Sequence, residues 1–416
     1  MIRYLLMLLL VFHAGFAAAR EWFVAPDGND TSGNGSVAKP YKTVMRLLNT
    51  SNGVAQAGDT ITLRGGTYNE CNVRLRKPLT VRSYPDENAH IHCKMDVPDS
   101  NVIQIDTEAS GSRLFNLEIS GGMYYGVMLQ TSWYGDGESG TGPSDIVLDH
   151  LKIHDTGHDG IKLTPKTHKI VIRNCEIRST GAIYPAGTSL DDRNADGIDM
   201  VNVADVTIED NYIHDISTTG LYFKGGSRNV VVQRNRIEHT GMSGILVGFD
   251  TSPEWFDTSV NPHYYEAFGG IVRNNYVYDT PYAGIGLYSA KDAVIVNNTI
   301  VDTARLGHAG IYFGISFQDW APEAGRPPSV DPLIRNNLVI QNGGACVAIR
   351  WAGELGGLSA LRGSPNTDWN GYYNRTGSCR FVDMRPGRIL RAARLAQWQA
   401  AEQTVRRRLA TPVPPQ

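Results

Sequence analysis

The sequence is poor in the features that mark specialised classes of protein. Only 19% of its 416 residues are charged and the formal net charge is −3, so it lacks the cationic excess typical of nucleic-acid binding. The composition also excludes a disordered chain, collagen and a coiled coil. Beyond the first nineteen residues, no apolar run reaches the roughly 18 residues needed to span a bilayer. We therefore expect an ordered globular protein without a membrane span and without a nucleic-acid partner.

The longest apolar run lies at the amino terminus. Arg3 precedes apolar residues 4–12, and Ala17, Ala18 and Ala19 follow with the small-residue spacing of a signal-peptidase site. This pattern predicts that residues 1–19 are a cleaved signal peptide. We expect the mature protein to be secreted or periplasmic.

Cysteine is scarce, with five residues, so an exported chain can form at most two disulfides. Cys71 with Cys93 and Cys346 with Cys379 are the near neighbours in sequence, although spacing alone does not prove either bridge. Cys175 is then the odd cysteine. We expect it to be a buried structural thiol rather than a nucleophile.

A repeat of about 24 residues runs from residue 110 to about residue 345. Its first landmark is an apolar residue that ends a short alternating run, at Ile119, Ile153, Ile177, Ile213, Ile237, Val277, Ile300 and Val339. Its second is a glycine that opens another short run, at Gly126, Gly160, Gly197, Gly220, Gly244, Gly284 and Gly310. The runs alternate with period two and no helical period of useful length occurs. Each repeat is therefore predicted to contain short strands.

A stack of such repeats predicts an all-β parallel β-helix, in which each coil buries its inward residues against its neighbours. A propeller is disfavoured because each blade needs roughly 40 residues. One recurring slot holds an asparagine, and we expect its amides to bond along the stack as an inward ladder. The ladder residues are Asn211, Asn235, Asn275, Asn298 and Asn337, with Cys175 in the same slot.

Four segments follow from the repeat. They are the signal peptide at 1–19, an N-terminal cap with the first coils at 20–110, the parallel β-helix with the functional face at 111–345, and a last coil with a C-terminal cap and helical tail at 346–416. The tail, from Ile389 to Leu409, is predicted to be an amphipathic helix that caps the stack, with membrane contact as a minor alternative.

Extra residues interrupt the repeat at about 131–143, 178–193, 249–266 and 316–328. Loops on a rigid stack are where binding groups concentrate. The loops carry several aromatic residues, among them Trp133 and Trp255, which as a set suit stacking on sugar faces. Covering the loop bases is the alternative role for any one ring.

Three aspartates are expected to converge on one outer face. Residues two past each landmark glycine point outward, which stacks Lys162 beside Asp199, while Asp159 and Asp196 come directly before their glycines. Carboxylates about 5 Å apart repel by roughly 3 kcal/mol at an effective dielectric near 20, so a cation must neutralise them. Oxygen-only donors favour calcium, with Asp192 on the preceding loop as a further ligand. A Lys162–Asp199 salt bridge is the structural alternative.

Lys224 lies one coil further on, four past Gly220 and beside Gly225 and Gly226. A cation on a uronate carboxylate acidifies the proton alpha to it, and a lysine about one sugar ring away could remove that proton in a β-elimination. Lys162 is the second candidate base, and a solvated Lys224 without a catalytic role is the alternative. The neighbouring side chains that would contact substrate are Tyr222, Arg228 and His158.

These motifs resemble the right-handed parallel β-helix polysaccharide lyases, most closely the calcium-dependent family-nine pectate lyase group. The resemblance rests on the segment from Phe23 to Tyr68, on the coils, and above all on Asp159-Gly160 followed by residues 194–199, Asn-Ala-Asp-Gly-Ile-Asp. It implies calcium ligation by Asp159, Asp196 and Asp199 and a lysine base at Lys224.

Three functions remain open at this point. The first is a lyase that cleaves an anionic, uronic-acid-containing polysaccharide with calcium, acting as a monomer. The second is a polygalacturonase-like hydrolase or a uronate epimerase, since residues 194–199 also resemble the first carboxylate motif of polygalacturonases. The third is a carbohydrate-binding β-helix without catalytic activity.

Overall fold

The structure, a computed structural model, describes residues 19–130, 141–316, 325–387 and 390–410 of the 416-residue chain. The predicted signal peptide lies outside these residues, apart from Ala19. Trp133 also lies outside them.

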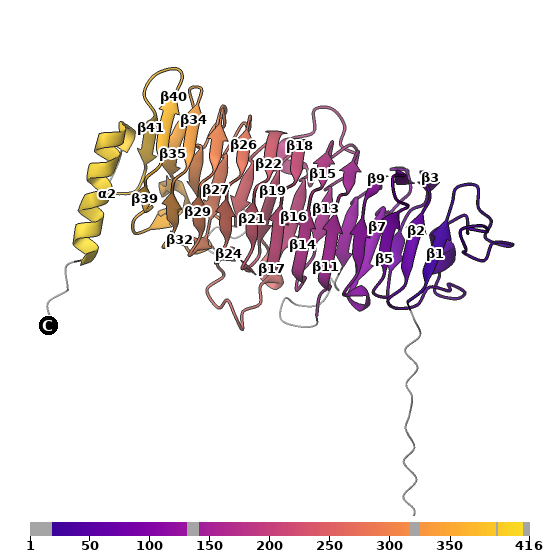
Figure 1. Cartoon of the computed structure of the whole chain (residues 1–416). Helices are drawn as coiled ribbons and strands as arrows, with labels where there is room; N and C mark the ends of the chain where they lie inside the picture. Colours follow the sequence, from indigo (N-terminus) through magenta and orange to yellow (C-terminus); the bar gives the residue numbers. More distant parts are fainter. Residues whose placement is uncertain (1–18, 131–140, 317–324, 388–389, 411–416) are drawn as a thin grey trace, which may run out of the picture.

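The described residues form a right-handed parallel β-helix, as predicted, with three long sheets that run along the stack (Figure 1). The 12-stranded sheet contains β4 (Val73–Leu75), β7 (Ile103–Asp106), β10 (Val127–Gln130), β13 (Ile161–Leu163), β16 (Ile198–Val201), β19 (Leu221–Lys224), β23 (Ile245–Val247), β27 (Ile285–Tyr288), β31 (Ile311–Gly314), β35 (Ala345–Ile349), β41 (Arg380–Asp383) and β42 (Leu390–Ala393). The 11-stranded sheet contains β3 (Gly66–Asn69), β6 (Ala89–Cys93), β9 (Leu117–Gly121), β12 (Lys152–His154), β15 (Glu176–Arg178), β18 (Tyr212–Ile216), β22 (Arg236–Thr240), β26 (Tyr276–Tyr278), β30 (Thr299–Val301), β34 (Leu338–Gln341) and β40 (Gly371–Asn374).

The third, 17-stranded sheet contains β1 (Glu21–Val24), β2 (Thr60–Leu63), β5 (Thr80–Ser83), β8 (Arg113–Phe115), β11 (Ser144–Asp149), β14 (His168–Arg173), β17 (Ala204–Glu209), β20 (Ser227–Arg228), β21 (Val231–Gln233), β24 (Ala267–Phe268), β25 (Ile271–Arg273), β28 (Ala290–Lys291), β29 (Val294–Val296), β32 (Ser329–Val330), β33 (Leu333–Arg335), β38 (Leu361–Arg362) and β39 (Thr367–Asp368). A short antiparallel pair joins β36 (Trp351–Ala352) and β37 (Leu358–Ser359). The α-helices of the described residues are α1 (Met45–Leu48) and α2 (Leu395–Ala410).

The interior of the stack is an apolar column built from the inward rows of the three sheets. On β13, Ile161 and Leu163 are fully buried and pair with Ile198 and Met200 of β16. The residue between them faces out, so Lys162 lies beside Asp199, and Asp199 beside Tyr222. The period-two alternation therefore gives the predicted register.

The asparagine ladder forms as predicted. The Asn211 side-chain amide donates to the side-chain oxygen Oδ1 of Asn235 at 2.9 Å. The same side-chain bond is repeated from coil to coil as far as Asn370. Each bond satisfies a buried amide that would otherwise be costly. Cys175 begins the series, donating its backbone N–H to Asn211. It is the free cysteine of the described residues, and burial raises its thiol pKa to about 12.

The landmark glycines are required because neighbouring coils pass too close for a side chain. A Cβ at Gly160 would lie 2.6 Å from the Ile177 Cγ2 atom and 2.8 Å from the Gly197 carbonyl oxygen. Both of those residues are landmarks of the next coil, so the two recurring positions in the sequence describe one packing contact.

Gly197→Ala is expected to destabilise the protein by about 1–3 kcal/mol, because its Cβ would overlap the Gly220 carbonyl oxygen and lie 2.8 Å from Ile213 Cγ2. Urea denaturation of the variant measures this loss. Gly65→Ala is the control, since its Cβ would find its nearest atom at 3.4 Å and leave stability nearly unchanged. Equal stability of the two variants would contradict the packing argument.

Both ends of the stack are covered. Near the amino end, α1 contacts β4 and the Cys71–Cys93 disulfide joins adjacent coils. At the other end, Trp398 of α2 packs against Phe381 of β41, the strand that directly follows Cys379 of the Cys346–Cys379 disulfide. Both disulfides match the near-neighbour pairs in the sequence.

The tail helix begins later than the sequence indicates. We expected it from Ile389, but residues 390–393 form β42, which pairs antiparallel with β41, and α2 starts at Leu395. The open edge of the 12-stranded sheet supplies hydrogen-bond partners that favour a strand there. In the part of the chain that the structure describes, no helix is long and apolar enough to cross a membrane.

Candidate active site

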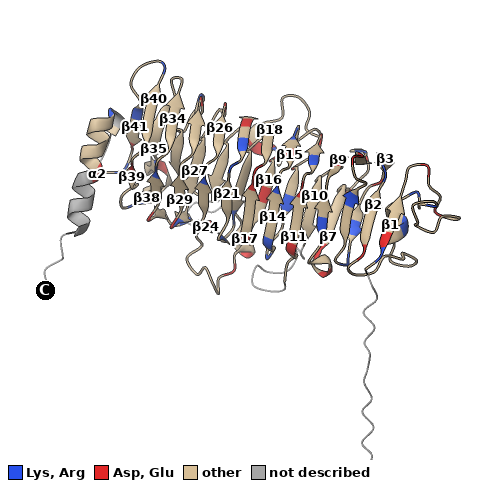
Figure 2. Cartoon of the chain, viewed as in Figure 1, with Lys and Arg blue, Asp and Glu red and all other residues tan. Residues whose placement is uncertain are grey.

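The candidate site lies on the outward face of the 12-stranded sheet, at β13, β16 and β19. Charged residues of both signs are scattered over the whole molecule, and acidic residues stand beside β16 in the middle of this sheet (Figure 2). Two neighbouring coils place Asp159 and Asp196 before their strands and Lys162 and Asp199 within them. The predicted cluster therefore forms on one wall of the solenoid.

The three aspartates converge but are more deeply buried than a simple surface row would be. Asp159 is 0% exposed, Asp196 4% and Asp199 1%. The Asp159 Oδ1 atom accepts the Asp196 backbone N–H at 2.8 Å. Asp159 Oδ2 and Asp199 Oδ1 are buried without a hydrogen-bond partner. The cluster thus carries two carboxylate oxygens able to accept a further donor or a cation.

Lys162 already occupies this cluster as a cation. Its Nζ atom donates a hydrogen bond to Asp199 Oδ2 and lies 4.0 Å from Asp159 Oδ2. Burial alone would lower the pKa of Lys162, but the charges of Asp199 and Asp159 outweigh it and raise the pKa. An amine held protonated in this way cannot act as a general base. The salt-bridge alternative for Lys162 is therefore the observed one.

Burial disfavours the charge on the remaining carboxyls. It raises the pKa of Asp159 well above its usual range, with Lys162 opposing the shift and the other aspartates adding to it. It raises the pKa of Asp196 to about 6, with Asp199 adding to the shift. The hydroxyl of Thr218 and the backbone N–H of Thr219 donate to Asp196 Oδ1 and partly offset this effect.

Asp196→Asn is expected to stabilise the protein at pH 7. The native state holds the Asp196 proton up to a pKa near 6, whereas the unfolded chain releases it near 3.8, so stability falls as pH rises between these values. The full cost above pH 6 is about 3 kcal/mol, and asparagine removes part of it while keeping the oxygen that Thr218 contacts. Urea denaturation at pH 4 and pH 7 should show a gain only at pH 7.

The control for this prediction is Asp191→Asn, because Asp191 is an exposed carboxylate on the neighbouring loop. It should change stability by less than about 0.5 kcal/mol at either pH. A gain for Asp196→Asn that is the same at pH 4 and pH 7 would contradict the titration argument.

The aspartate cluster has the donor chemistry of a calcium site but not yet its geometry. Three carboxylates with two unpartnered buried oxygens are donors of the type that calcium prefers. Within the described part of the chain, however, the trio does not bring one oxygen each to within 4.8 Å of the others, and the Lys162 ammonium stands against two of its members. The donor chemistry fits calcium, and its binding would have to displace Lys162.

Lys224 sits one coil further along, at the end of β19. Its Nζ atom lies 4.6 Å from the centre of the Tyr222 ring and 5.6 Å from that of Phe249, and its charge lowers the pKa of Asp196. Among the described residues, no hydrogen bond or salt bridge of this ammonium group is found. Lys224 is half-buried, so part of its side chain remains exposed to solvent.

A buried glutamate holds the turn that follows Lys224. Glu266 is fully buried, and its Oε2 atom accepts the Gly225 backbone N–H at 2.8 Å. Its Oε1 atom lies 3.2 Å from Arg326 Nε. Glu266 ends the inserted segment 249–266, so this loop fixes the backbone that carries Lys224. Sequence reasoning did not identify Glu266 or Arg326.

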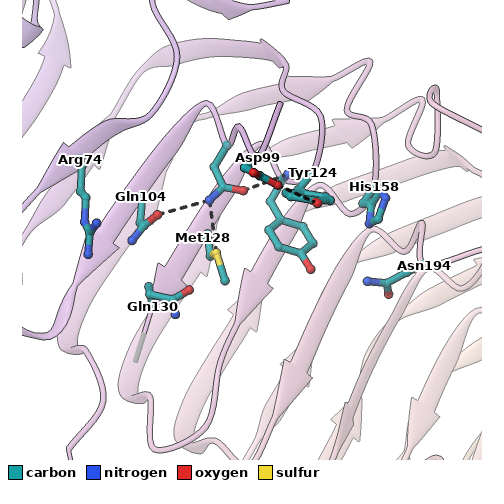
Figure 3. A pocket seen from close by; sticks show the side chains of 10 residues that line it. Arg74, Asp99, Gln104, Tyr124, Met128, Gln130, His158 and Asn194 are labelled. Carbon is teal, nitrogen blue, oxygen red and sulfur yellow. Dashed lines mark hydrogen bonds between the residues drawn. The ribbon is translucent and has the colours of Figure 1, made fainter. Parts of the chain in front are cut away.

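A pocket of about 470 Å³ adjoins the aspartate cluster on the same sheet (Figure 3). His158, beside Asp159, lines it, and the Tyr125 ring centre lies 5.9 Å from Lys162 Nζ. The lining residues are Arg74, Asp99, Asn101, Gln104, Tyr124, Tyr125, Met128, Gln130, His158 and Asn194. Aromatic rings beside amide and guanidinium donors are suited to a sugar chain.

Of the three side chains predicted to contact substrate beside Lys224, the structure places only His158 in the pocket. The His158 ring stacks on Tyr184, and burial, with help from Lys162, lowers the pKa of His158. Tyr222 is only 4% exposed, so its ring supports Lys224 and offers little face to a sugar. Arg228 belongs to β20 of the 17-stranded sheet, around the Gly225–Gly226 turn from Lys224, and thus faces elsewhere.

The predicted site residues on the inserted loops lie apart from the aspartate cluster or outside the described residues. Trp255 is partly buried on a loop that folds back along the stack, and its carbonyl accepts the Asn202 side chain at 2.7 Å. Asp192 is exposed in a 3₁₀ turn, and none of the contacts among described residues links its carboxylate to the buried trio. Trp133 lies outside the described residues.

The pocket residues Arg74 and Gln104 were missed because the repeat was recognised only from residue 110. In the structure, β4 and β7 are already regular strands of the 12-stranded sheet, and Arg74, Gln104, Met128 and Lys162 pair in one row. The signal was present in the alternation of residues 73–75 and 103–106.

Comparisons with known proteins agree with this architecture. A family model described as "Right handed beta helix region" matches residues 133–254, and no curated protein matches the sequence. A pectate lyase structure, Pel9A, is similar at 15% identity, covering 80% of this chain and 78% of its own, with a TM-score of 0.54. The A-module of the mannuronan C-5 epimerase AlgE6 from Azotobacter vinelandii aligns at 13% identity over 79% and 88% of the two chains, with a TM-score of 0.50.

A third similar structure is the Dettilon tailspike protein, at 14% identity over 85% of this chain and 68% of its own, with a TM-score of 0.50. Identities this low establish similarity of fold alone. The chain therefore shares the right-handed parallel β-helix fold of a pectate lyase, a mannuronan epimerase module and a tailspike protein.

Proposed function

We propose that this protein is a polysaccharide lyase that cleaves a uronic-acid-containing glycan by β-elimination, with Lys224 as the base. The observation that carries the proposal is the contrast between the two lysines of the site. Lys162 is held protonated between aspartates, whereas the half-buried Lys224 places its ammonium group over the rings of Tyr222 and Phe249 and forms no hydrogen bond or salt bridge with the described residues.

In the proposed reaction, neutral Lys224 removes the proton alpha to the uronate carboxylate. The electron pair forms a carbon–carbon double bond, and the glycosidic oxygen on the β-carbon leaves and takes a proton from solvent. The rings of Tyr222 and Phe249 stabilise the ammonium ion that results. The adjoining pocket, with Tyr124, Tyr125 and Asn194, would bind a neighbouring sugar.

Calcium is part of the proposal. Asp159, Asp196 and Asp199 are the residues that would hold it, in competition with Lys162. When bound, calcium would neutralise the substrate carboxylate and acidify the alpha proton. Export of the mature chain and its monomeric state likewise remain predictions.

The test is to incubate the mature chain with pectate, alginate and glycosaminoglycans, with calcium or with a chelator. A lyase produces unsaturated uronides, seen by their ultraviolet absorbance, and we expect the chelator to reduce the rate. New reducing ends without absorbance would instead identify a hydrolase. Altered uronate stereochemistry by NMR without cleavage would identify an epimerase, and retention on a glycan column without any reaction would identify a binding protein.

A further inference from the structure

A second group of polar side chains lies on the outer face of the 11-stranded sheet, away from the candidate active site. His90 on β6, Glu118 on β9 and His154 on β12 come from three successive coils. Their ligand atoms all lie within 4.8 Å of one another, and no other group of three His, Cys, Asp or Glu residues in the described part of the chain does so. All three side chains are partly exposed, so an ion can reach them.

The spacing of these atoms is already close to that of a tetrahedral metal centre. The His154 Nε2 atom lies 3.2 Å from Glu118 Oε1, and His90 Nδ1 lies 3.7 Å from the same oxygen. Ligand atoms around a tetrahedral zinc ion, with bonds of about 2.0–2.1 Å, are about 3.4 Å apart. Two edges of the tetrahedron therefore need only small side-chain movements.

The outer nitrogens of both imidazoles have partners that orient the rings. His154 Nδ1 lies 2.7 Å from the Asp155 carboxylate, which leaves Nε2 directed at Glu118. His90 Nε2 lies 2.7 Å from the Ser120 hydroxyl, which leaves Nδ1 on the side of Glu118. A carboxylate or hydroxyl on the far nitrogen is the usual second partner of a metal-binding histidine.

The far oxygen of the shared carboxylate also has a partner. The Asn88 side chain donates to Glu118 Oε2 at 2.6 Å, whereas Glu118 Oε1 is the atom that lies near both imidazoles. Such a hydrogen bond to the outer oxygen is a usual feature of a metal-binding carboxylate.

A second group of side chains on the same sheet has the same arrangement as the first but lacks one of the two imidazoles. Two coils along, His214 lies 3.3 Å from Glu176 and 2.8 Å from Asp215, which repeats the arrangement of His154, Glu118 and Asp155. Strand pairing places Lys152 beside Glu176, where the first site has His90 beside Glu118. The second site therefore has a carboxylate and one imidazole but an ammonium group in place of the other.

We propose that His90, Glu118 and His154 form a binding site for a divalent transition-metal ion of the zinc type. Two imidazoles and one carboxylate form a ligand set that suits Zn²⁺, and a water molecule would complete the tetrahedron. An ion there joins three coils on a sheet that does not carry Lys224. Its effect is on the stability of the N-terminal coils, independently of the proposed lyase activity.

The test uses the mature chain after chelator treatment, titrated with ZnCl₂ by calorimetry and by competition with a chromogenic chelator. The wild type should bind a single tight zinc ion and gain a few degrees in Tm. His154→Ala and His90→Ala should each lose this ion and this gain, whereas His214→Ala, the matched control, should keep both. Thermal melts without zinc verify that each variant is folded.

A gain-of-site variant tests the same proposal without removing any residue of the first site. Lys152→His completes the second site with Glu176 and His214, so zinc stoichiometry should rise from one to two ions per chain. Failure of the wild type to bind zinc would overturn the proposal, as would unchanged binding in both His90→Ala and His154→Ala. An unchanged stoichiometry in Lys152→His would contradict the claim that the second imidazole distinguishes the two sites.

Discussion

Lys224→Ala should lower kcat/KM for uronide formation by a factor of about 100 or more, because the reaction loses the group that takes the alpha proton. Lys162 cannot replace it, because the buried Asp199 and Asp159 carboxyl groups hold its ammonium group protonated. The measurement is the initial rate of ultraviolet absorbance increase on whichever glycan the wild type cleaves. Stability should hardly change, because Lys224 is half-buried and, within the described part of the chain, its ammonium group forms no hydrogen bond or salt bridge and lies over two aromatic rings.

Two further variants separate a base from a mere positive charge. Lys224→Arg keeps the charge but arginine does not deprotonate in proteins, so it should be nearly as inactive as Lys224→Ala. Lys291→Ala is the control, because Lys291 also lies over a tyrosine ring, that of Tyr265 at 5.9 Å, but on the 17-stranded sheet. Full activity in Lys224→Arg would refute the base assignment while leaving an electrostatic role.

The fold could be predicted because one packing contact repeats at a fixed spacing. The isoleucine and glycine landmarks meet between neighbouring coils, as Ile177 does with Gly160, and a period-two strand between them fixes which residues face out. From this register alone the outward pairing of Lys162 with Asp199 was predicted correctly.

What the register could not predict is how deeply each outward residue is covered. Outward alternation describes a bare sheet, but loops and neighbouring side chains cover this one, so Tyr222 and the aspartates are buried although they face outward. The burial decides the chemistry, because it raises the pKa of Asp196 and requires Lys162 as a counter-charge. Such tertiary covering carries no periodic signal in the sequence.

The histidine group on the 11-stranded sheet was missed for a different reason. His90 and Glu118 are directly paired, but His154 reaches Glu118 diagonally from the next coil, across an inserted loop that makes the sequence spacing irregular. His90 also precedes residue 110, where the repeat was first recognised. Fixed ligand spacings, which identify most zinc sites in sequences, do not apply to ligands on successive coils.

Lys162→Met should destabilise the protein by about 3–5 kcal/mol at pH 7, because it leaves two buried carboxylates without their cation. Methionine fills a similar volume, so the loss reports the charge rather than a cavity. Urea denaturation gives the free energy of unfolding. The control is Lys166→Met, which breaks the more exposed Lys166–Asp257 pair and should cost distinctly less.

A double variant shows whether the loss belongs to the ion pair. In Lys162→Met with Asp199→Asn, one of the unpaired charges is gone, so most of the lost stability should return. Additive losses in the double variant would contradict the assignment of the destabilisation to unpaired charge.

The single variant Lys162→Met also tests calcium binding at the aspartates, independently of catalysis. With the Lys162 ammonium absent, Asp199 Oδ2 joins Asp159 Oδ2 and Asp199 Oδ1 as buried oxygens without a partner, so added calcium should restore stability to Lys162→Met and raise its Tm by several degrees. The wild type should respond less, because calcium must first displace the lysine. If calcium leaves the Tm of Lys162→Met unchanged, the three aspartates are a lysine-binding cluster, and the proposed lyase would have to neutralise its substrate by other means.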